Sequence, residues 1–153
     1  MFTVTYDPLR GSYENLVLRV EASRYFEKAV DSSWVAGFLH EDLTAETTPE
    51  EIRAFLNYLA LKFTDAPTGA FIPFGLFEEC VEGFLITNVA DELLTVSYSR
   101  TVQLTGYEVA PSNLESLMLE RAPAFKEEAN WVIPRTSVLD GLQSSIQQLS
   151  TTT

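Results

Sequence analysis

The stretch VAGFLHEDLTAETTPEEIRAFLNYLALKF, residues 35–63, carries the clearest helix signal of the chain. Thr48 is suited to cap a helix, Pro49 to occupy its first position and Glu51 to complete a capping box. Five apolar side chains then recur at the spacing of one helical face: Ile52, Phe55, Leu56, Leu59 and Phe63. The sequence therefore predicts an amphipathic helix that begins at Thr48 and buries this face against a core.

The size and composition of the chain are those of a single globular domain. It has 153 residues, of which 46% are hydrophobic and 21% charged, and one core suffices at this length. We expect one domain over residues 1–150 and a frayed tail over residues 151–153. No apolar run approaches the roughly 20 residues that span a bilayer, and the N-terminus lacks a signal-peptide pattern, so we expect a cytoplasmic protein. Cys80 is the only cysteine, which excludes an internal disulfide and a cysteine-rich zinc site.

Periodicity in the rest of the chain predicts an α+β fold. Short segments alternate between apolar and polar residues, which is typical of strands with one face on a core. Strands are expected over residues 2–6, 15–22, 82–89, 94–98 and 102–109. Helices are expected over residues 24–39 with an interruption at 31–33, after Thr48, after a Ser112 cap and after a Ser137 cap. Residues 70–76 contain Pro73 and Gly75 and are assigned to no regular element. We predict an antiparallel sheet of two hairpin-like strand pairs, covered on one face by a single layer of about four amphipathic helices.

Charge is distributed unevenly along the chain. Twenty-two acidic residues against ten basic ones give a net charge of −12, which disfavours nucleic acid and anionic membranes as partners because both repel a negative surface. Residues 29–52 and 63–99 each contain six acids and neither lysine nor arginine, whereas the remaining chain carries ten acids and ten bases. Acidic residues of this kind either keep the protein in solution or form a face that attracts a basic protein.

Candidate catalytic and metal-binding groups are few. His40 is the only histidine, and the run from His40 to Asp42 lacks the ligand spacing of a zinc motif. Cys80 lies between acidic neighbours, which raise the pKa of a thiol and disfavour the thiolate nucleophile. The sequence contains no P-loop, no GxGxxG and no GxSxG motif. We therefore expect neither enzymatic activity nor a cofactor or metal.

Four phenylalanines lie close together in the middle of the chain. Phe71, Phe74, Phe77 and Phe84 occur within residues 71–84, in a stretch flanked by acids. Such a cluster forms either core beneath a loop or the wall of a binding pocket. The sequence leaves both interpretations open.

The run Gly37-Phe38-Leu39-His40-Glu41-Asp42-Leu43, followed by the helix start at residues 48–52, resembles a segment of some bacterial immunity proteins of contact-dependent growth inhibition and related polymorphic toxin systems. In that family an aromatic pair, a histidine or asparagine, a glutamine or glutamate and an aspartate precede an amphipathic helix. This chain departs from the pattern at Leu39 and Leu43, where the family has aromatic residues. The resemblance implies a small, acidic, cofactor-free cytoplasmic protein that blocks a basic nuclease or another toxin domain.

Three hypotheses of different classes follow. The first is an acidic binding protein, most simply an immunity protein, whose carboxylates pair with a basic partner: Glu41, Asp42, Glu46, Glu78, Glu79 and Glu82. The second is a small-molecule-binding or enzymatic α+β domain with a pocket between the sheet and the Thr48 helix, lined by Phe71, Phe74 and Phe84. The third is a phage-type structural or assembly protein that self-associates through the apolar stripe between Leu139 and Leu149. Partner identity, oligomeric state and strand order remain open.

Overall fold

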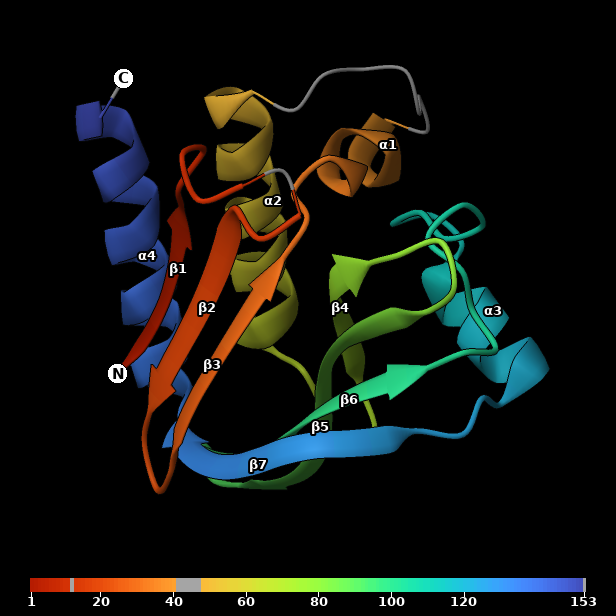
Figure 1. Ribbon diagram of the computed structural model, residues 1–153. Coiled ribbons are helices and arrows are strands. Elements are labelled where there is room, and N and C mark those ends of the chain that lie inside the picture. Colours follow the sequence, from red (N-terminus) through yellow and green to blue (C-terminus); the bar gives the residue numbers. More distant parts are fainter. Residues whose placement is uncertain (12, 41–47, 153) are drawn as a thin grey trace.

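The chain folds into two antiparallel sheets and four helices across residues 1–11, 13–40 and 48–152, which are the residues that the computed structural model describes (Figure 1). The first sheet has the order β1 (Phe2–Tyr6), β2 (Leu16–Glu21) and β3 (Tyr25–Val30). The second has the order β4 (Phe71–Leu76), β5 (Val81–Ala90), β6 (Leu93–Thr101) and β7 (Lys126–Pro134). The helices are α1 (Trp34–His40), α2 (Pro49–Thr64), α3 (Leu114–Arg121) and α4 (Arg135–Thr152). The α+β class is as predicted, but the strands form two separate sheets of three and four strands instead of one sheet built from two pairs.

Helix α2 is the central element of the core, as its sequence predicts. The Thr48 hydroxyl caps it by accepting a hydrogen bond from the Glu51 amide at 3.3 Å. The five periodic apolar side chains are all fully buried. Aromatic contacts connect both sheets through this helix, because the Phe63 ring lies 5.8 Å from that of Phe2 in β1 and 5.3 Å from that of Phe84 in β5. One continuous core therefore unites the two sheets.

Helix α4 closes the outer edge of β1, and Figure 1 shows the two elements side by side. A Cβ atom added to Gly141 would come within 1.7 Å of the Phe2 carbonyl oxygen, so glycine permits the close approach. The Val4 amide donates to the Ser145 hydroxyl at 3.0 Å, which satisfies an edge donor that would otherwise be available to another strand. The helix begins at Arg135, so Ser137 lies within it and the predicted cap is wrong.

Three strands, β3, β4 and β7, were not predicted. Residues 25–30 form β3 and not the first part of a helix, because they pair with β2 in the register Phe26↔Val20. Residues 126–134 form β7, which pairs with β6 on the side opposite β5. The strand expected over residues 102–109 is wrong: this segment consists of bends and turns. β4 tolerates Pro73 and Gly75 because it is an edge strand with a register shift between these two residues.

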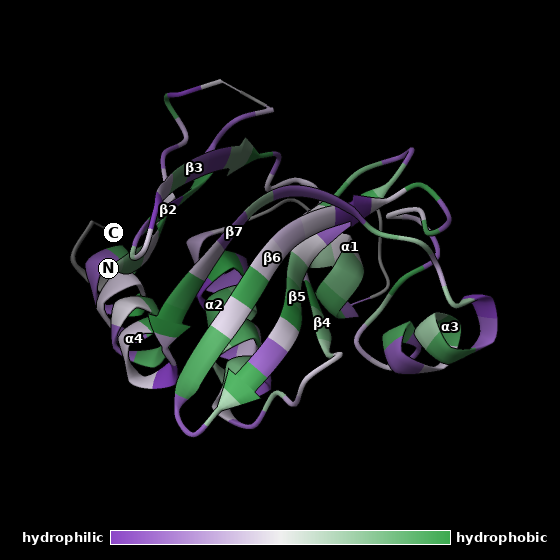
Figure 2. Ribbon diagram, turned by 90° about the horizontal axis from the view of Figure 1, so that it is seen from below, coloured by the Kyte–Doolittle hydropathy of each residue, from purple (hydrophilic) through white to green (hydrophobic). Residues whose placement is uncertain are grey.

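Helix α3 stands at the side of the second sheet, away from the main body (Figure 2). Leu114 is its only fully buried residue. Its cap position is Asn113 and not Ser112, and the Asn113 side chain makes no capping bond to the helix. α3 is therefore held by other contacts, described below. None of the helices in the described chain is both long and apolar enough to cross a membrane.

Candidate docking surface and apolar cleft

The six predicted partner-binding carboxylates lie in three different settings. Glu41, Asp42 and Glu46 fall outside the described residues. Glu78 and Glu79 are exposed in the turn between β4 and β5. Glu82, three residues beyond Glu79, is only 3% exposed. Among the described residues, the structure therefore keeps two of the six at the surface.

Glu82 belongs to a buried polar cluster that joins the two sheets. Its carboxylate oxygen Oε1 accepts a hydrogen bond from the Tyr98 hydroxyl at 2.9 Å and lies 3.3 Å from Nζ of Lys28, which comes from β3. The same ammonium group lies 3.1 Å from Oε2 of Glu128 in β7. Burial raises the pKa of Glu82, while Lys28 and the Tyr98 hydroxyl oppose the shift. Glu82 thus makes an internal contact, and its burial removes it from the surface available to a partner.

The turn that carries the exposed Glu78 and Glu79 is hydrogen-bonded to the loop that carries one ring of an aromatic pair. The Gly106 amide donates to the Phe77 carbonyl at 2.7 Å, which places the loop after β6 against the β4–β5 turn. A Cβ atom on Gly106 would lie 3.0 Å from the Trp34 ring at the start of α1. The Trp34 and Tyr107 rings meet edge to face with centroids 4.8 Å apart. We call Trp34, Tyr107, Glu78 and Glu79 the acidic–aromatic surface.

Four of the ten basic side chains form ion pairs with acids of the protein itself among the described residues. These side chains form five ion pairs: Arg19–Glu27, Lys28–Glu82, Lys28–Glu128, Arg121–Glu108 and Arg135–Glu92. No lysine or arginine of the described chain forms an ion pair with Glu78 or Glu79. Tyr107 is 56% exposed to solvent. The acidic–aromatic surface therefore offers two exposed carboxylates that form no ion pair with a described lysine or arginine, in a turn bonded to the loop of an accessible ring.

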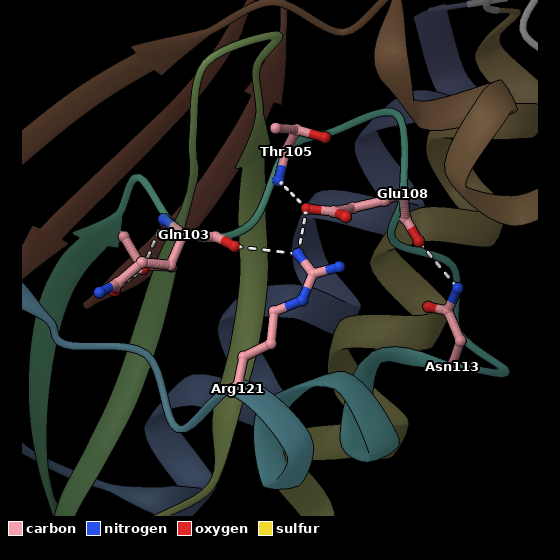
Figure 3. Close-up of polar contacts among 6 residues, drawn as sticks. Gln103, Thr105, Glu108, Asn113 and Arg121 are labelled. Carbon is pink, nitrogen blue, oxygen red and sulfur yellow. Dashed lines mark hydrogen bonds and ion pairs between the residues drawn. The ribbon is translucent and has the colours of Figure 1, made fainter.

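Polar contacts connect this surface to α3 (Figure 3). A carboxylate oxygen of Glu108 accepts from Nη1 of Arg121 at 2.7 Å and from the Thr105 amide at 2.9 Å. Arg121 also donates to the Gln103 carbonyl at 3.1 Å, and the Asn113 side chain donates to the Glu108 carbonyl at 2.8 Å. Hydrogen bonding to Arg121 lowers the pKa of Glu108. Both ends of α3 are thus tied to the loop that carries Tyr107.

An apolar cleft of about 500 Å³ opens between α2, the start of β4 and α3. Its lining includes Tyr58 from α2, Phe71 from β4 and Met118 from α3. Burial raises the pKa of Tyr58 to about 12, so its hydroxyl is neutral at physiological pH. Three charged residues line the cleft, namely Lys62, Asp65 and Glu115. The Lys62 ammonium lies over the Tyr58 ring, 5.7 Å from its centroid.

The phenylalanine cluster of the sequence is divided between core and cleft. Phe74 and Phe84 are fully buried, with ring centroids 5.6 Å apart. Phe71 is half-buried, lines the cleft and contacts Phe125 at 5.2 Å. The cleft lies at the β4 edge between α2 and α3, and of the three residues predicted to line a pocket between the sheet and α2, only Phe71 lines it.

His40 and Cys80, which the sequence offers for catalysis, have the following surroundings in the described structure. Nε2 of the exposed His40 lies 2.7 Å from a carboxylate oxygen of Glu51. Burial and the nearby Glu82 raise the pKa of the Cys80 thiol, which disfavours its nucleophilic form. Within residues 1–11, 13–40 and 48–152, no three histidine, cysteine, aspartate or glutamate side chains gather as a metal site.

Sequence reasoning missed Trp34 and Tyr107 as a surface pair because Tyr107 was assigned to a strand. Their contact joins two segments more than 70 residues apart in sequence, and no local pattern reports such a contact. A scan against protein-family models, a search of curated proteins and a search of solved structures each gave no match. The acidic–aromatic surface and the cleft are therefore interpreted from their own chemistry.

Proposed function

We propose that this protein is an acidic binding protein that neutralises a basic protein partner, most simply as an immunity protein that blocks a toxin domain. The observation that carries the proposal is the acidic–aromatic surface, where Glu78 and Glu79 form no ion pair with the described basic residues and their turn is bonded to the loop of the exposed Tyr107. The resemblance of residues 37–43 to immunity proteins supports the same conclusion. α1 contains the first part of that segment and also supplies Trp34 to the surface.

Two physical effects would act together at this surface. The net charge of −12 attracts a cationic partner over a Debye length of about 8–10 Å, which raises the association rate. At contact, a lysine or arginine of the partner would meet a carboxylate on one side and an aromatic ring on the other. A cation over an aromatic face gains about 0.5–2 kcal/mol, depending on how far it is desolvated. Charge thus brings the partner to the surface, and the rings hold its cationic side chains there.

The test compares two double charge reversals in an affinity purification from the native cell. Glu78→Lys/Glu79→Lys alters the acidic–aromatic surface. Glu21→Lys/Asp140→Lys makes the same change in charge at the end of β2 and in the first half of α4, which lie at the other end of the molecule (Figure 1). We expect the wild-type protein and the control variant to retain a basic protein that the first variant loses.

The association rate of the retained protein, measured at low and at high salt, then shows whether long-range electrostatic attraction contributes to binding. Reversal at Glu78 and Glu79 should slow association strongly at low salt and much less at high salt, because salt screens the attraction. Recovery of no basic protein by the wild type would refute the proposed function. Equal losses in both double variants would show that total charge matters and that the acidic–aromatic surface does not.

A further inference from the structure

We propose that the cleft between α2 and α3 is an anchor pocket for a bulky apolar side chain of the basic partner. This inference rests on the proposed function and assigns a second contact to the same partner. The cleft volume of about 500 Å³ lies within the range of about 300–1,000 Å³ that is usual for ligand pockets. It has room for a large side chain and part of the backbone that carries it.

The lining favours an apolar occupant. Most of the lining residues are apolar or lack a side chain that can form hydrogen bonds, and the larger apolar ones include Phe71, Leu114 and Met118. Within the described chain, the only fully buried side-chain polar atom without a hydrogen-bond partner is Nε1 of Trp131, which does not line the cleft. Among the described residues, the cleft lining therefore contains no fully buried, unbonded polar atom that would orient a polar small molecule.

The charges around the cleft favour an occupant carried on a basic chain. Asp65 and Glu115 contribute two carboxylates, whereas Lys62 is the only cationic residue among the described residues of the lining and lies over the Tyr58 ring. An apolar side chain of the partner would be buried in the cleft. Lysine or arginine residues next to it in the partner's sequence would then lie near Asp65 and Glu115. An anionic amphiphile would instead meet both carboxylates and the net negative charge of the protein.

Two apolar side chains of α3 at the cleft are left accessible, as expected if a partner covers them. Leu119 lines the cleft and is 81% exposed, and Met118 is half-buried. The polar ties of Figure 3 connect α3 to the loop bearing Tyr107, so the cleft and the acidic–aromatic surface share one supporting segment. A single partner chain would thus be able to contact both.

The methionine content of the chain permits a direct test. Met1 and Met118 are the only two methionines, and Met118 lines the cleft whereas Met1 is 58% exposed at the N-terminus. In protein labelled with ¹³C at the methionine methyl groups, Met118 reports on the cleft and Met1 serves as an internal control. The probes are two fluorescein-labelled peptides of lysine and glycine, one with a central Phe-Leu pair and the other with Ser-Ser in its place.

We expect the Phe-Leu peptide to shift the Met118 signal saturably, to leave Met1 unchanged, and to bind about tenfold or more tightly than the Ser-Ser peptide, because burying a large apolar side chain is strongly favourable. Leu119→Ser should weaken binding of the Phe-Leu peptide selectively. Leu61→Ser is the matched control, since Leu61 is a 68% exposed leucine of α2 that does not line the cleft.

The outcomes distinguish this inference from the proposed function. If both peptides bind equally by fluorescence anisotropy at low salt while Met118 does not respond, the anchor pocket is refuted and the acidic binding surface stands. If neither peptide binds, both proposals fail. If neutral naphthalene shifts Met118 at lower concentration than the Phe-Leu peptide does, the cleft is a small-molecule site and the inference is wrong.

Discussion

The buried cluster between the two sheets allows a quantitative prediction for Lys28→Met. This substitution keeps most of the aliphatic stem of Lys28 and removes its ammonium group, which lies 3.3 Å from a Glu82 carboxylate that is 3% exposed. It also removes the contact to Glu128 and the charge 6.0 Å from the centre of the Tyr98 ring. The variant therefore leaves a buried carboxylate without its cation.

The expected cost follows from the geometry of the cluster. Removing one partner of a buried ion pair costs about 3–5 kcal/mol, and losing a hydrogen bond to a charged group costs about 1.5–3 kcal/mol. The Lys28 side chain is 26% exposed, so the pair is not fully buried. Glu82 would also still accept the hydrogen bond from the Tyr98 hydroxyl at 2.9 Å. We therefore expect Lys28→Met to lower the free energy of unfolding at pH 8 by about 2–3 kcal/mol, within the range for a charged hydrogen bond and not above the lower end of the range for a buried pair.

The loss should depend on pH in a defined direction. Burial raises the pKa of Glu82 even with Lys28 present, and removal of the cation raises it further. A native carboxyl group with a raised pKa holds its proton more tightly than the unfolded chain does. The associated stability is therefore present at acidic pH and lost as pH rises through the native pKa. The deficit of Lys28→Met relative to the wild type should shrink between pH 8 and pH 5.

Urea unfolding monitored by tryptophan fluorescence at both pH values measures this effect. The matched control is Arg19→Met, which breaks the Arg19–Glu27 pair in the same sheet, where both side chains are 37% exposed. An exposed pair contributes about 0–1 kcal/mol, so the control should change stability little. The reasoning is refuted if Lys28→Met costs no more than Arg19→Met at pH 8, or if its deficit grows as the pH falls.

Three further predictions concern single contacts. Thr48→Ala should destabilise the protein by about 1 kcal/mol in chemical denaturation, because it removes the cap of α2, whereas Thr48→Ser should not. Gly141→Ala should cost about 3 kcal/mol or prevent folding, although alanine normally favours a helix, because its Cβ would overlap the Phe2 carbonyl; unchanged stability would contradict the packing. Glu108→Gln should accelerate hydrogen exchange of α3 amides at neutral pH. Since Arg121 lowers the pKa of Glu108, the wild type should show the same acceleration only as pH falls through that lowered pKa, where the carboxylate is lost.

The sequence predicted an element correctly where the signal was local. α2 has a cap, a proline at its first position and five apolar residues on one face, all within 16 residues of one another. β3 was taken for a helix because Phe26 and Val30 are four residues apart, a spacing compatible with both a helix and a strand. Pairing with β2 decides between the two. β7 begins with three charged residues, so its apolar alternation is short, and its pairing with β6 is again a long-range effect.

The same long-range dependence explains what was missed at the candidate site. The exposure of Glu78 and Glu79 follows from an acidic turn between apolar runs and was predictable. The burial of Glu82 was not, because its cation is Lys28 and this lysine lies on the strand that had been assigned to a helix. Because an unpaired glutamate is almost always exposed, the sequence alone predicts that Glu82 lies at the surface.

The position of α3 links the stability of the fold to the proposed docking role. A helix with one fully buried residue gains little from the hydrophobic effect, so its placement depends on the polar ties from Glu108 and Asn113 to both of its ends. Directional ties fix the orientation of a helix without covering its apolar side chains. Leu119 and Met118 consequently stay accessible at the cleft while the loop carrying Tyr107 is held in place. A helix buried by its own apolar face would have been more stable, but it would have left no cleft for a partner to fill.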